Sequence, residues 1–165
     1  LIEFCRQGAE RGRRVFLLGG LDDVAERSAE VLAKRYPGLK IAGAISPSFG
    51  FDRKGDETAK ILATIRESRP DIVFIGAGAP KQEKWLHRNW EALGPVVGIG
   101  VGAAFDFISG RIPRAPTWLQ KAGLEWFWRL VHEPRRLFRR YIIEDLPLFV
   151  YLFVKCLGSR WKRTG

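Results

Sequence analysis

Two glycine-rich turns stand where a short apolar run gives way to a helical pattern. The first is Gly19-Gly20, after the apolar residues 15–18, and the second is 76–79, before Pro80. Backbone N–H groups in such a turn, together with the positive end of the helix dipole, can bind a phosphate group. Each turn taken singly is better explained by the conformational freedom of glycine. An anion site is therefore one of two interpretations at this point.

Three hydrogen-bonding side chains follow the second turn, those of Lys81, Gln82 and Glu83. A cation at the positive end of a helix dipole is mildly unfavourable, and it is better explained if an anion also binds there. A solvated helix start, in which Glu83 interacts favourably with the dipole, explains the same residues equally well.

A carboxylate, Asp106, stands between Phe105 and Phe107 in a later glycine-containing segment. It could accept hydrogen bonds from a sugar or a base. It could equally be the N-cap of a helix or the ion-pair partner of Arg111 or Arg114.

Several common site types are excluded. Gly50 and Gly55 have the spacing of a P-loop, but an Asp-Glu pair follows where Lys-Ser/Thr is required. Gly100-Val101-Gly102 is followed by phenylalanine where the dinucleotide motif requires glycine or alanine. ATPase and NAD-dependent functions are therefore not indicated.

The remaining nucleophile and metal-ligand types are isolated. His87 and His132 belong to no metal or catalytic pattern, and Cys5 and Cys156 lie near opposite ends without CxxC spacing. We expect no zinc site and no disulfide framework, and a reducing, cytosolic setting.

Alternating strands and helices must position these turns. Apolar runs predict strands at 15–18, 40–45, 71–76 and 95–101, and helical spacing predicts helices at 21–36, 56–68 and 80–92. Asp23 and Glu26 have the spacing of a capping box at the start of the first of these helices. The predicted fold class is α/β, with a Rossmann-like parallel sheet and helices on both faces. Ligands bind beyond the carboxyl ends of such strands, which predicts the site at Gly19-Gly20 and in the loops 46–51, 76–82 and 102–110.

The charge is concentrated in the last third of the chain. The 165 residues hold 28 Lys+Arg against 18 Asp+Glu, a net charge of +10. Counted along the sequence, residues 1–110 hold 16 basic and 14 acidic residues, and residues 111–165 hold 12 and 4. Half of the 20 aromatic residues also lie in 111–165. We therefore predict an α/β domain at 1–110 and a basic, aromatic, helical appendage at 111–165, which would suit either a membrane surface or nucleic acid.

Within the appendage, four arginines recur at the i, i+4 spacing of one helix face: Arg135, Arg136, Arg139 and Arg140. No apolar run is long enough to span a bilayer. The chain opens inside a helical pattern without a methionine, and we expect that preceding sequence is absent from it.

Five segments in order resemble the WecG, TagA and CpsF family of glycosyltransferases: VFLLGG, SPSFGF, PDIVFIGAGAPKQEKW, GIGVGAAFDFISGRIPRAP and GLEWFWRLVHEPRRLFRRY. The resemblance covers essentially residues 1–155. It implies a bacterial enzyme that moves a sugar from a UDP-sugar to a polyprenyl-diphosphate-linked acceptor, in the synthesis of a surface polysaccharide or teichoic acid. It also implies a cytoplasmic protein that is peripheral on the inner face of the membrane.

The resemblance carries over to individual residues. The implied substrate-binding set is Gly19, Gly20, Gly78, Ala79, Pro80, Lys81, Gln82, Glu83, Gly102, Asp106 and Arg114. The implied catalytic set is Gln82, near the transferred sugar, with Arg129, Arg136 and Arg139, which would approach the diphosphate and the membrane. Fixed cations and N–H dipoles would stabilise the leaving UDP while the acceptor hydroxyl attacks the anomeric carbon.

The chain departs from the family in two respects. The family's general base, an aspartate in a DG-type motif, belongs to an N-terminal segment that would precede residue 1, so we expect donor binding and the membrane tail without that base. Ser48 replaces a proline that similar loops often have, and the stiffness of the loop could differ. There is no DxD motif, and we expect no metal and no cofactor besides the UDP-sugar substrate.

The expected partners are the lipid-linked acceptor and an anionic membrane, with no nucleic acid and with a homo-oligomer left open. The alternative function is a non-catalytic basic α/β module that binds membrane or nucleic acid.

Overall fold

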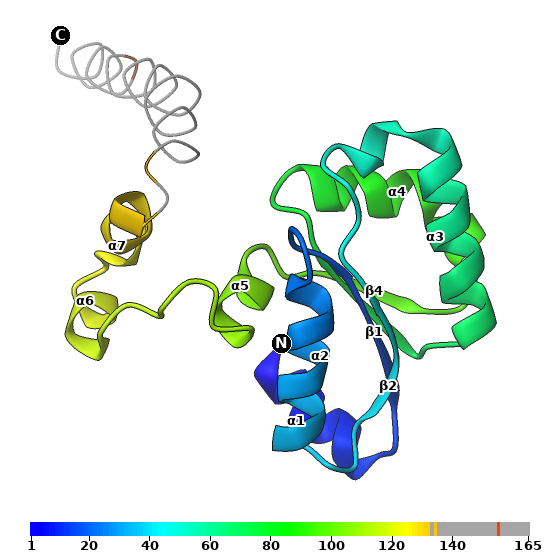
Figure 1. Ribbon diagram of the computed structural model, residues 1–165, viewed down its shortest axis with the longest axis horizontal. Coiled ribbons are helices and arrows are strands. Elements are labelled where there is room, and N and C mark those ends of the chain that lie inside the picture. Colours follow the sequence, from blue (N-terminus) through cyan, green and yellow to red (C-terminus); the bar gives the residue numbers. More distant parts are fainter. Residues whose placement is uncertain (133, 135–154, 156–165) are drawn as a thin grey trace, which may run out of the picture. The chain divides into compact units, whose positions relative to one another are not determined.

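The computed structural model describes residues 1–132, 134 and 155 of the chain (Figure 1). The chain divides into two compact units, Leu1–Pro113 and Arg114–Gly165, which are described separately below. The first unit contains, in order, α1 (Ile2–Glu10), β1 (Arg14–Gly19), α2 (Val24–Arg35), β2 (Lys40–Ile45), the 3-10 turn η1 (Phe51–Arg53), α3 (Gly55–Ser68), β3 (Ile72–Gly76), α4 (Lys81–Leu93), β4 (Val97–Gly100) and α5 (Ala104–Ile108).

The four strands form one parallel sheet in the order β2-β1-β3-β4. The predicted α/β class is confirmed. The chain moves outward from β1 to β2, then returns across β1 to form β3 on its other side. Strand order therefore reverses between β1 and β3, and in open parallel sheets ligands bind beyond the carboxyl ends of the strands at such a point.

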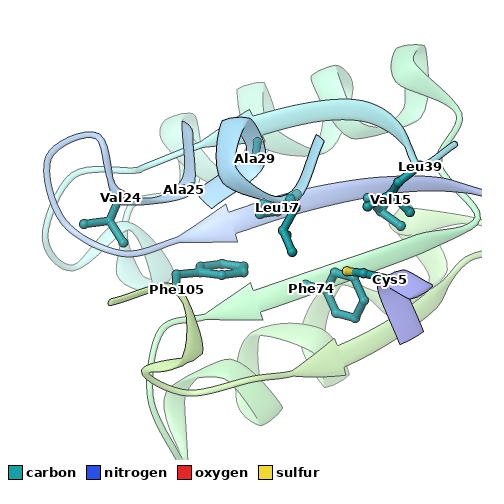
Figure 2. Packing of buried hydrophobic residues seen from close by; sticks show 10 residues of the cluster. Cys5, Val15, Leu17, Val24, Ala25, Ala29, Leu39, Phe74 and Phe105 are labelled. Carbon is teal, nitrogen blue, oxygen red and sulfur yellow. The ribbon is translucent and has the colours of Figure 1, made fainter. Parts of the chain in front are cut away.

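The core lies on both faces of the sheet, because successive residues of a strand point to opposite sides. Val15 and Leu17 of β1 pack with α1, α2 and Phe105 of α5 on one face (Figure 2). Phe16 and Leu18 pack on the other face with residues of η1, α3 and α4. Unbroken apolar runs in β1 and β3 follow from this covering on both sides.

Cys5 of α1 is part of the first of these clusters and is fully buried. Burial raises the pKa of its thiol to about 11, because the apolar surroundings disfavour the thiolate. This cysteine therefore has a packing role and little nucleophilic character at neutral pH.

Two local predictions are wrong. The helix expected from residue 21 begins at Val24, and Asp23 makes no side-chain cap; its carboxylate instead accepts a hydrogen bond from Arg27 Nε at 2.7 Å. The segment 102–110, predicted as a loop, contains the short helix α5.

The second unit contains α6 (Thr117–Lys121) and α7 (Glu125–His132), in agreement with the helical pattern predicted for this region. Trp118, Phe127 and Val131 are exposed. No helix within residues 1–132 is long and apolar enough to cross a membrane. The predicted arginine strip, Arg135, Arg136, Arg139 and Arg140, lies outside the described residues.

Candidate functional site

The turns that follow β1 and β3 meet at the reversal of strand order. Gly19 and Gly76 are register partners, and the N–H of Gly20 donates to the carbonyl of Gly76 at 3.0 Å. A Cβ on Gly19 would lie 2.6 Å from the backbone of Gly76, and Gly19 has a φ of +125°. Both the close approach and the backbone conformation therefore require glycine at this position. The two turns predicted to bind an anion lie side by side.

Two backbone N–H groups at the start of α4 already donate hydrogen bonds within the turn. The carbonyl of Gly78 accepts hydrogen bonds from the N–H groups of Lys81 at 2.9 Å and Gln82 at 3.1 Å. These two N–H groups are therefore not available to a phosphate as the turn stands. The Ala79-Pro80 peptide bond is cis. The cationic group that this turn offers to a ligand is the exposed side chain of Lys81.

Gln82 is 5% exposed, and its amide joins two turns. Its Oε1 accepts the N–H of Gly102 at 3.0 Å, and its Nε2 donates to Glu83 Oε1 at 2.8 Å. Gly100 has to be glycine for this packing, because a Cβ there would lie 2.5 Å from the Gln82 Nε2. The contacts of Gln82 thus fix the turn after β4 against the start of α4 and orient the Glu83 carboxylate. Its predicted place near the transferred sugar stays a prediction.

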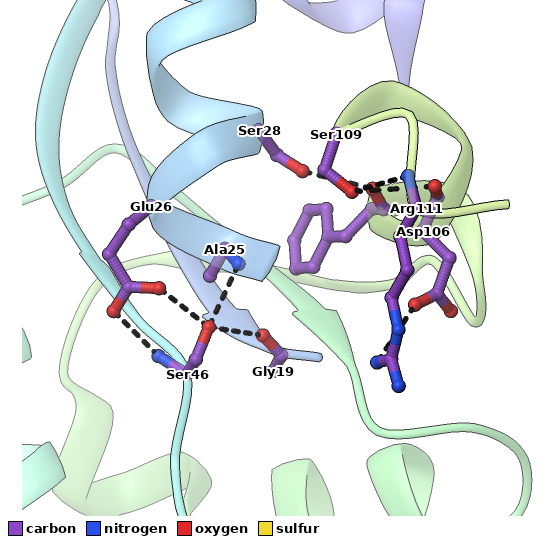
Figure 3. A network of polar contacts seen from close by, with 9 residues as sticks. Gly19, Ala25, Glu26, Ser28, Ser46, Asp106, Ser109 and Arg111 are labelled. Carbon is purple, nitrogen blue, oxygen red and sulfur yellow. Dashed lines mark hydrogen bonds and ion pairs between the residues drawn. The ribbon is translucent and has the colours of Figure 1, made fainter. Parts of the chain in front are cut away.

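Asp106 lies inside α5 and is 6% exposed. The N-cap interpretation is therefore wrong, and the pairing with Arg111 is confirmed, with 3.7 Å between Asp106 Oδ1 and Arg111 Nη1 (Figure 3). The preceding residue, Phe105, packs against the end of β3, since a Cβ on Gly76 would lie 2.6 Å from its ring. Packing of Phe105 places α5 at the carboxyl edge of the sheet.

A serine and a glutamate join the end of β2 to the first turn of α2 (Figure 3). Ser46 Oγ donates to Glu26 Oε2 at 2.6 Å and accepts the N–H of Ala25 at 2.9 Å, and the Ser46 N–H donates to Glu26 Oε1 at 2.9 Å. Glu26, predicted to complete a capping box, has this role instead. Sequence spacing could not reveal it, because the two partners are 20 residues apart.

The loop after β2 contains a residue to which the sequence assigned no role. Phe49 is 79% exposed, and the Lys81 Nζ lies 5.2 Å from the centroid of its ring. A signal was present in the sequence, since an aromatic residue stands in a predicted ligand loop between Ser48 and Gly50. The loop residue that follows them, Phe51, is buried, and sequence alone does not distinguish the two phenylalanines.

Four predicted arginines lie beyond the first unit in the sequence. Arg114 belongs to the second unit. Arg129 lies in α7, but its side chain is not described, and Arg136 and Arg139 lie outside the described residues. The remaining predicted residues, all in the first unit, lie in or next to the turns at the carboxyl ends of β1, β3 and β4. Within the described part of the chain, no group of three or more His, Cys, Asp or Glu could hold a metal ion.

The model of the glycosyl transferase WecG/TagA/CpsF family matches residues 1–163. The chain belongs to this family. Its turns at the sheet edge are therefore turns of a glycosyltransferase family, as the resemblance implied.

Two curated relatives that share one name are similar to most of this chain. The chain is 36% identical over 141 residues to N-acetylglucosaminyldiphosphoundecaprenol N-acetyl-beta-D-mannosaminyltransferase of Bacillus subtilis strain 168, covering 86% of this chain and 53% of the relative. It is 32% identical over 143 residues to the protein of the same name from Staphylococcus aureus strain MW2, covering 87% and 53%. This WecG/TagA/CpsF chain therefore spans about half the length of the curated relatives it matches. Membership of a transferase family favours the glycosyltransferase interpretation over the non-catalytic basic module.

Proposed function

We propose that this chain binds the sugar-nucleotide donor of a glycosyltransferase that passes an N-acetylmannosaminyl group from UDP to N-acetylglucosaminyl-diphospho-undecaprenol. The names of both curated relatives support this transferred group and this acceptor. The observation that carries the proposal is the meeting of the Gly19-Gly20 turn with the turn after β3, at the reversal of strand order in a chain that belongs to the family.

The donor's diphosphate would lie beside these two turns. Gly19 lets the turn after β1 lie directly against Gly76 at the end of β3, and the side chain of Lys81 is exposed at the start of α4. A fixed cation there would stabilise the charge that develops on UDP as the bond to the sugar breaks. Gln82 and Asp106 are nearly buried and already bonded, which suits side chains that hold the turns in shape.

The acceptor and the membrane are assigned to the basic end of the chain. Residues 111–165 hold 12 basic and 4 acidic residues by count, with Arg129, Arg136 and Arg139 among them. Arginines bind phosphate groups, and neighbouring tryptophans suit the level of lipid headgroups. We propose a peripheral association with the inner face of the cell membrane on this basis.

Titration of the 165-residue chain with UDP by isothermal calorimetry tests the proposal. We expect saturable binding that UDP-N-acetylmannosamine displaces. Lys81→Ala should weaken UDP binding roughly 10- to 100-fold, the range for a lost charged hydrogen bond of about 1.5–3 kcal/mol. Lys84→Ala is the matched control, because Lys84 is exposed one turn further along the same helix, and it should bind UDP as the wild type does.

Two further measurements separate the proposal from its alternatives. The proposed donor site needs no metal ion, so UDP binding that disappears in EDTA contradicts that part. Single-stranded DNA is titrated at two salt concentrations, because a basic nucleic-acid module would bind it tightly and with strong salt dependence. Tight DNA binding without saturable UDP binding would overturn the glycosyltransferase proposal.

A further inference from the structure

Phe49 is the most exposed large apolar side chain among the described residues, at 79%. It lies in the loop that follows β2, at the same edge of the sheet as the glycine turns. Burial of a phenylalanine side chain contributes about 1.5–3 kcal/mol of free energy, and the exposed side chain of Phe49 gains little of this from the fold. The ring is therefore available to a ligand that supplies a flat apolar surface.

The residues on either side of Phe49 hold the backbone of the loop in place. The Ser48 N–H donates to Glu57 Oε1 at 2.8 Å, its Oγ donates to Glu57 Oε2 at 2.5 Å, and Lys54 Nζ donates to the same Oγ at 2.7 Å. On the other side Phe51 is buried against Trp85, with ring centroids 5.9 Å apart. The backbone of Phe49 is thus fixed from both directions, which lowers the entropy lost when a ligand binds to the ring.

Phe49 and Lys81 come from different loops and meet. The Lys81 Nζ lies 5.2 Å from the Phe49 ring centroid, within the range of a cation–π interaction. One side of the ring therefore faces a cation at the start of α4, and most of its surface remains open. An aromatic surface next to an ammonium group matches a ligand that carries a flat base and a phosphate within the same molecule.

We propose that Phe49 is the stacking platform for the nucleobase of the donor, while Lys81 binds the diphosphate of the same nucleotide. This inference rests on the proposed function and adds the residue that recognises the base end of the donor. Aromatic–aromatic contacts place ring centroids about 4.5–7 Å apart, so the base would lie roughly 10 Å from the ammonium group. That separation is comparable to the length of a nucleoside diphosphate.

The test compares two ligands, UDP and inorganic pyrophosphate, on four forms of the chain. Replacing an aromatic platform by alanine costs about 1–3 kcal/mol per stacked base, so Phe49→Ala should weaken UDP binding roughly 5- to 100-fold. Pyrophosphate has no base, and its affinity should not change. Phe49→Trp should bind UDP at least as well as the wild type, because a larger aromatic ring is retained.

Trp90→Ala is the control for removal of an exposed aromatic residue elsewhere. Trp90 lies on α4 and is 69% exposed, and its removal should leave UDP binding unchanged. Circular dichroism and the urea midpoint of each variant confirm that the fold is retained, as expected for an exposed side chain.

Each outcome supports or overturns the inference. Loss of UDP affinity in Phe49→Ala with unchanged pyrophosphate affinity supports it. Equal UDP affinity in wild type and Phe49→Ala overturns it and leaves the proposed function intact, whereas a wild type that does not bind UDP overturns both. Equal loss of UDP and pyrophosphate affinity overturns it too, because Phe49 would then act through the shape of the loop and not by stacking on the base. If Phe49→Ala retains UDP affinity but sediments less with vesicles of phosphatidylglycerol, the ring contacts lipid, and stacking is overturned.

Discussion

The carboxylate of Glu57, in the first turn of α3, accepts two hydrogen bonds from one residue of the loop before it. Both donors belong to Ser48, its hydroxyl and its backbone N–H, and Lys54 lies nearby. These hydrogen bonds lower the pKa of Glu57 from its ordinary value of 4.5, because they favour the ionised form. A proline at position 48 could donate neither hydrogen bond. The loop with Ser48 is held by hydrogen bonds to Glu57, whereas a proline ring would restrict the backbone itself.

Because the pKa of Glu57 is lowered, the stability that its hydrogen bonds to Ser48 contribute depends on pH. Because the folded state holds Glu57 at a pKa below its unfolded value, the stabilisation is fully present above about pH 4.5 and is lost as pH falls through the folded pKa. Glu57→Gln should therefore be less stable than the wild type at pH 7. The difference should shrink as the solution is acidified, which urea unfolding at a series of pH values measures.

The stabilities of Glu57→Gln and the wild type have to be compared with each other at every pH. Glu3, whose pKa is lowered to about 2 by Arg6, and Asp71, whose pKa is lowered by the N–H of Arg14, also make the whole chain sensitive to acid. Glu30→Gln is the control, because Glu30 is exposed in the middle of α2. A constant difference between Glu57→Gln and the wild type down to strong acid would contradict the linkage.

The hydroxyl of Ser46 connects the end of β2 to the first turn of α2. Ser46→Ala removes the acceptor of the Ala25 N–H and one donor to the Glu26 carboxylate. We expect a loss of about 1–2 kcal/mol in the free energy of unfolding, the range for a lost helix-start acceptor in a partly buried place. Hydrogen exchange should also speed up in the first turn of α2 more than in α3.

Thr64→Ala provides the matched control for Ser46→Ala. Its hydroxyl donates to the carbonyl of Lys60 one turn earlier in α3, at 3.0 Å and in an exposed place. Loss of such a bond in a helix is nearly neutral, because alanine has the better helix propensity. If both variants lost the same stability, Ser46 would have no special role in joining the two elements.

The sheet could be predicted from the sequence because its strands are short apolar runs, and β1, β3 and β4 end in glycine. The predicted strand 40–45 has the bounds of β2, and the predicted 71–76 differs from β3 by one residue. The five residues of α5 are too few to show a helical period, and this helix was missed. A strand of four to six residues can thus be recognised from an apolar run, whereas a helix as short as α5 has too few turns to show its spacing.

The sequence predicted at which edge of the sheet the candidate site lies, but not which side chains contact one another there. Parallel topology alone brings the turns at Gly19 and 76–79 together, and topology follows from the order of strands and helices. By contrast, Phe49 and Phe51 are identical in type and two residues apart, yet one is 79% exposed and the other 6%. Such differences depend on tertiary packing, as does the internal hydrogen bonding of Gln82, and no periodicity in the sequence reports them.

The two anionic partners proposed above, the sugar-nucleotide donor and the membrane surface, would bind parts of the chain that differ in charge. The first 110 residues hold 16 basic and 14 acidic residues by count, so donor binding there would depend on a few placed groups such as Lys81. The last 55 residues hold 12 and 4. Attraction of this end to an anionic surface would come from many charges acting together, and added salt would weaken it more than it weakens donor binding.

Removal of two arginines from the basic end tests this difference. Each basic residue near an anionic surface contributes about 1 kcal/mol, so Arg136→Ala with Arg139→Ala should weaken sedimentation with phosphatidylglycerol vesicles roughly 30-fold at low salt. Arg11→Ala with Arg88→Ala lowers the net charge of the chain by the same amount, but from exposed positions in the nearly neutral part. This control should sediment almost as the wild type does. An equal loss of sedimentation in both double variants would mean that total charge alone attracts the chain to the membrane. Unchanged sedimentation of the Arg136/Arg139 variant would mean that these arginines bind only the phosphates of the ligand.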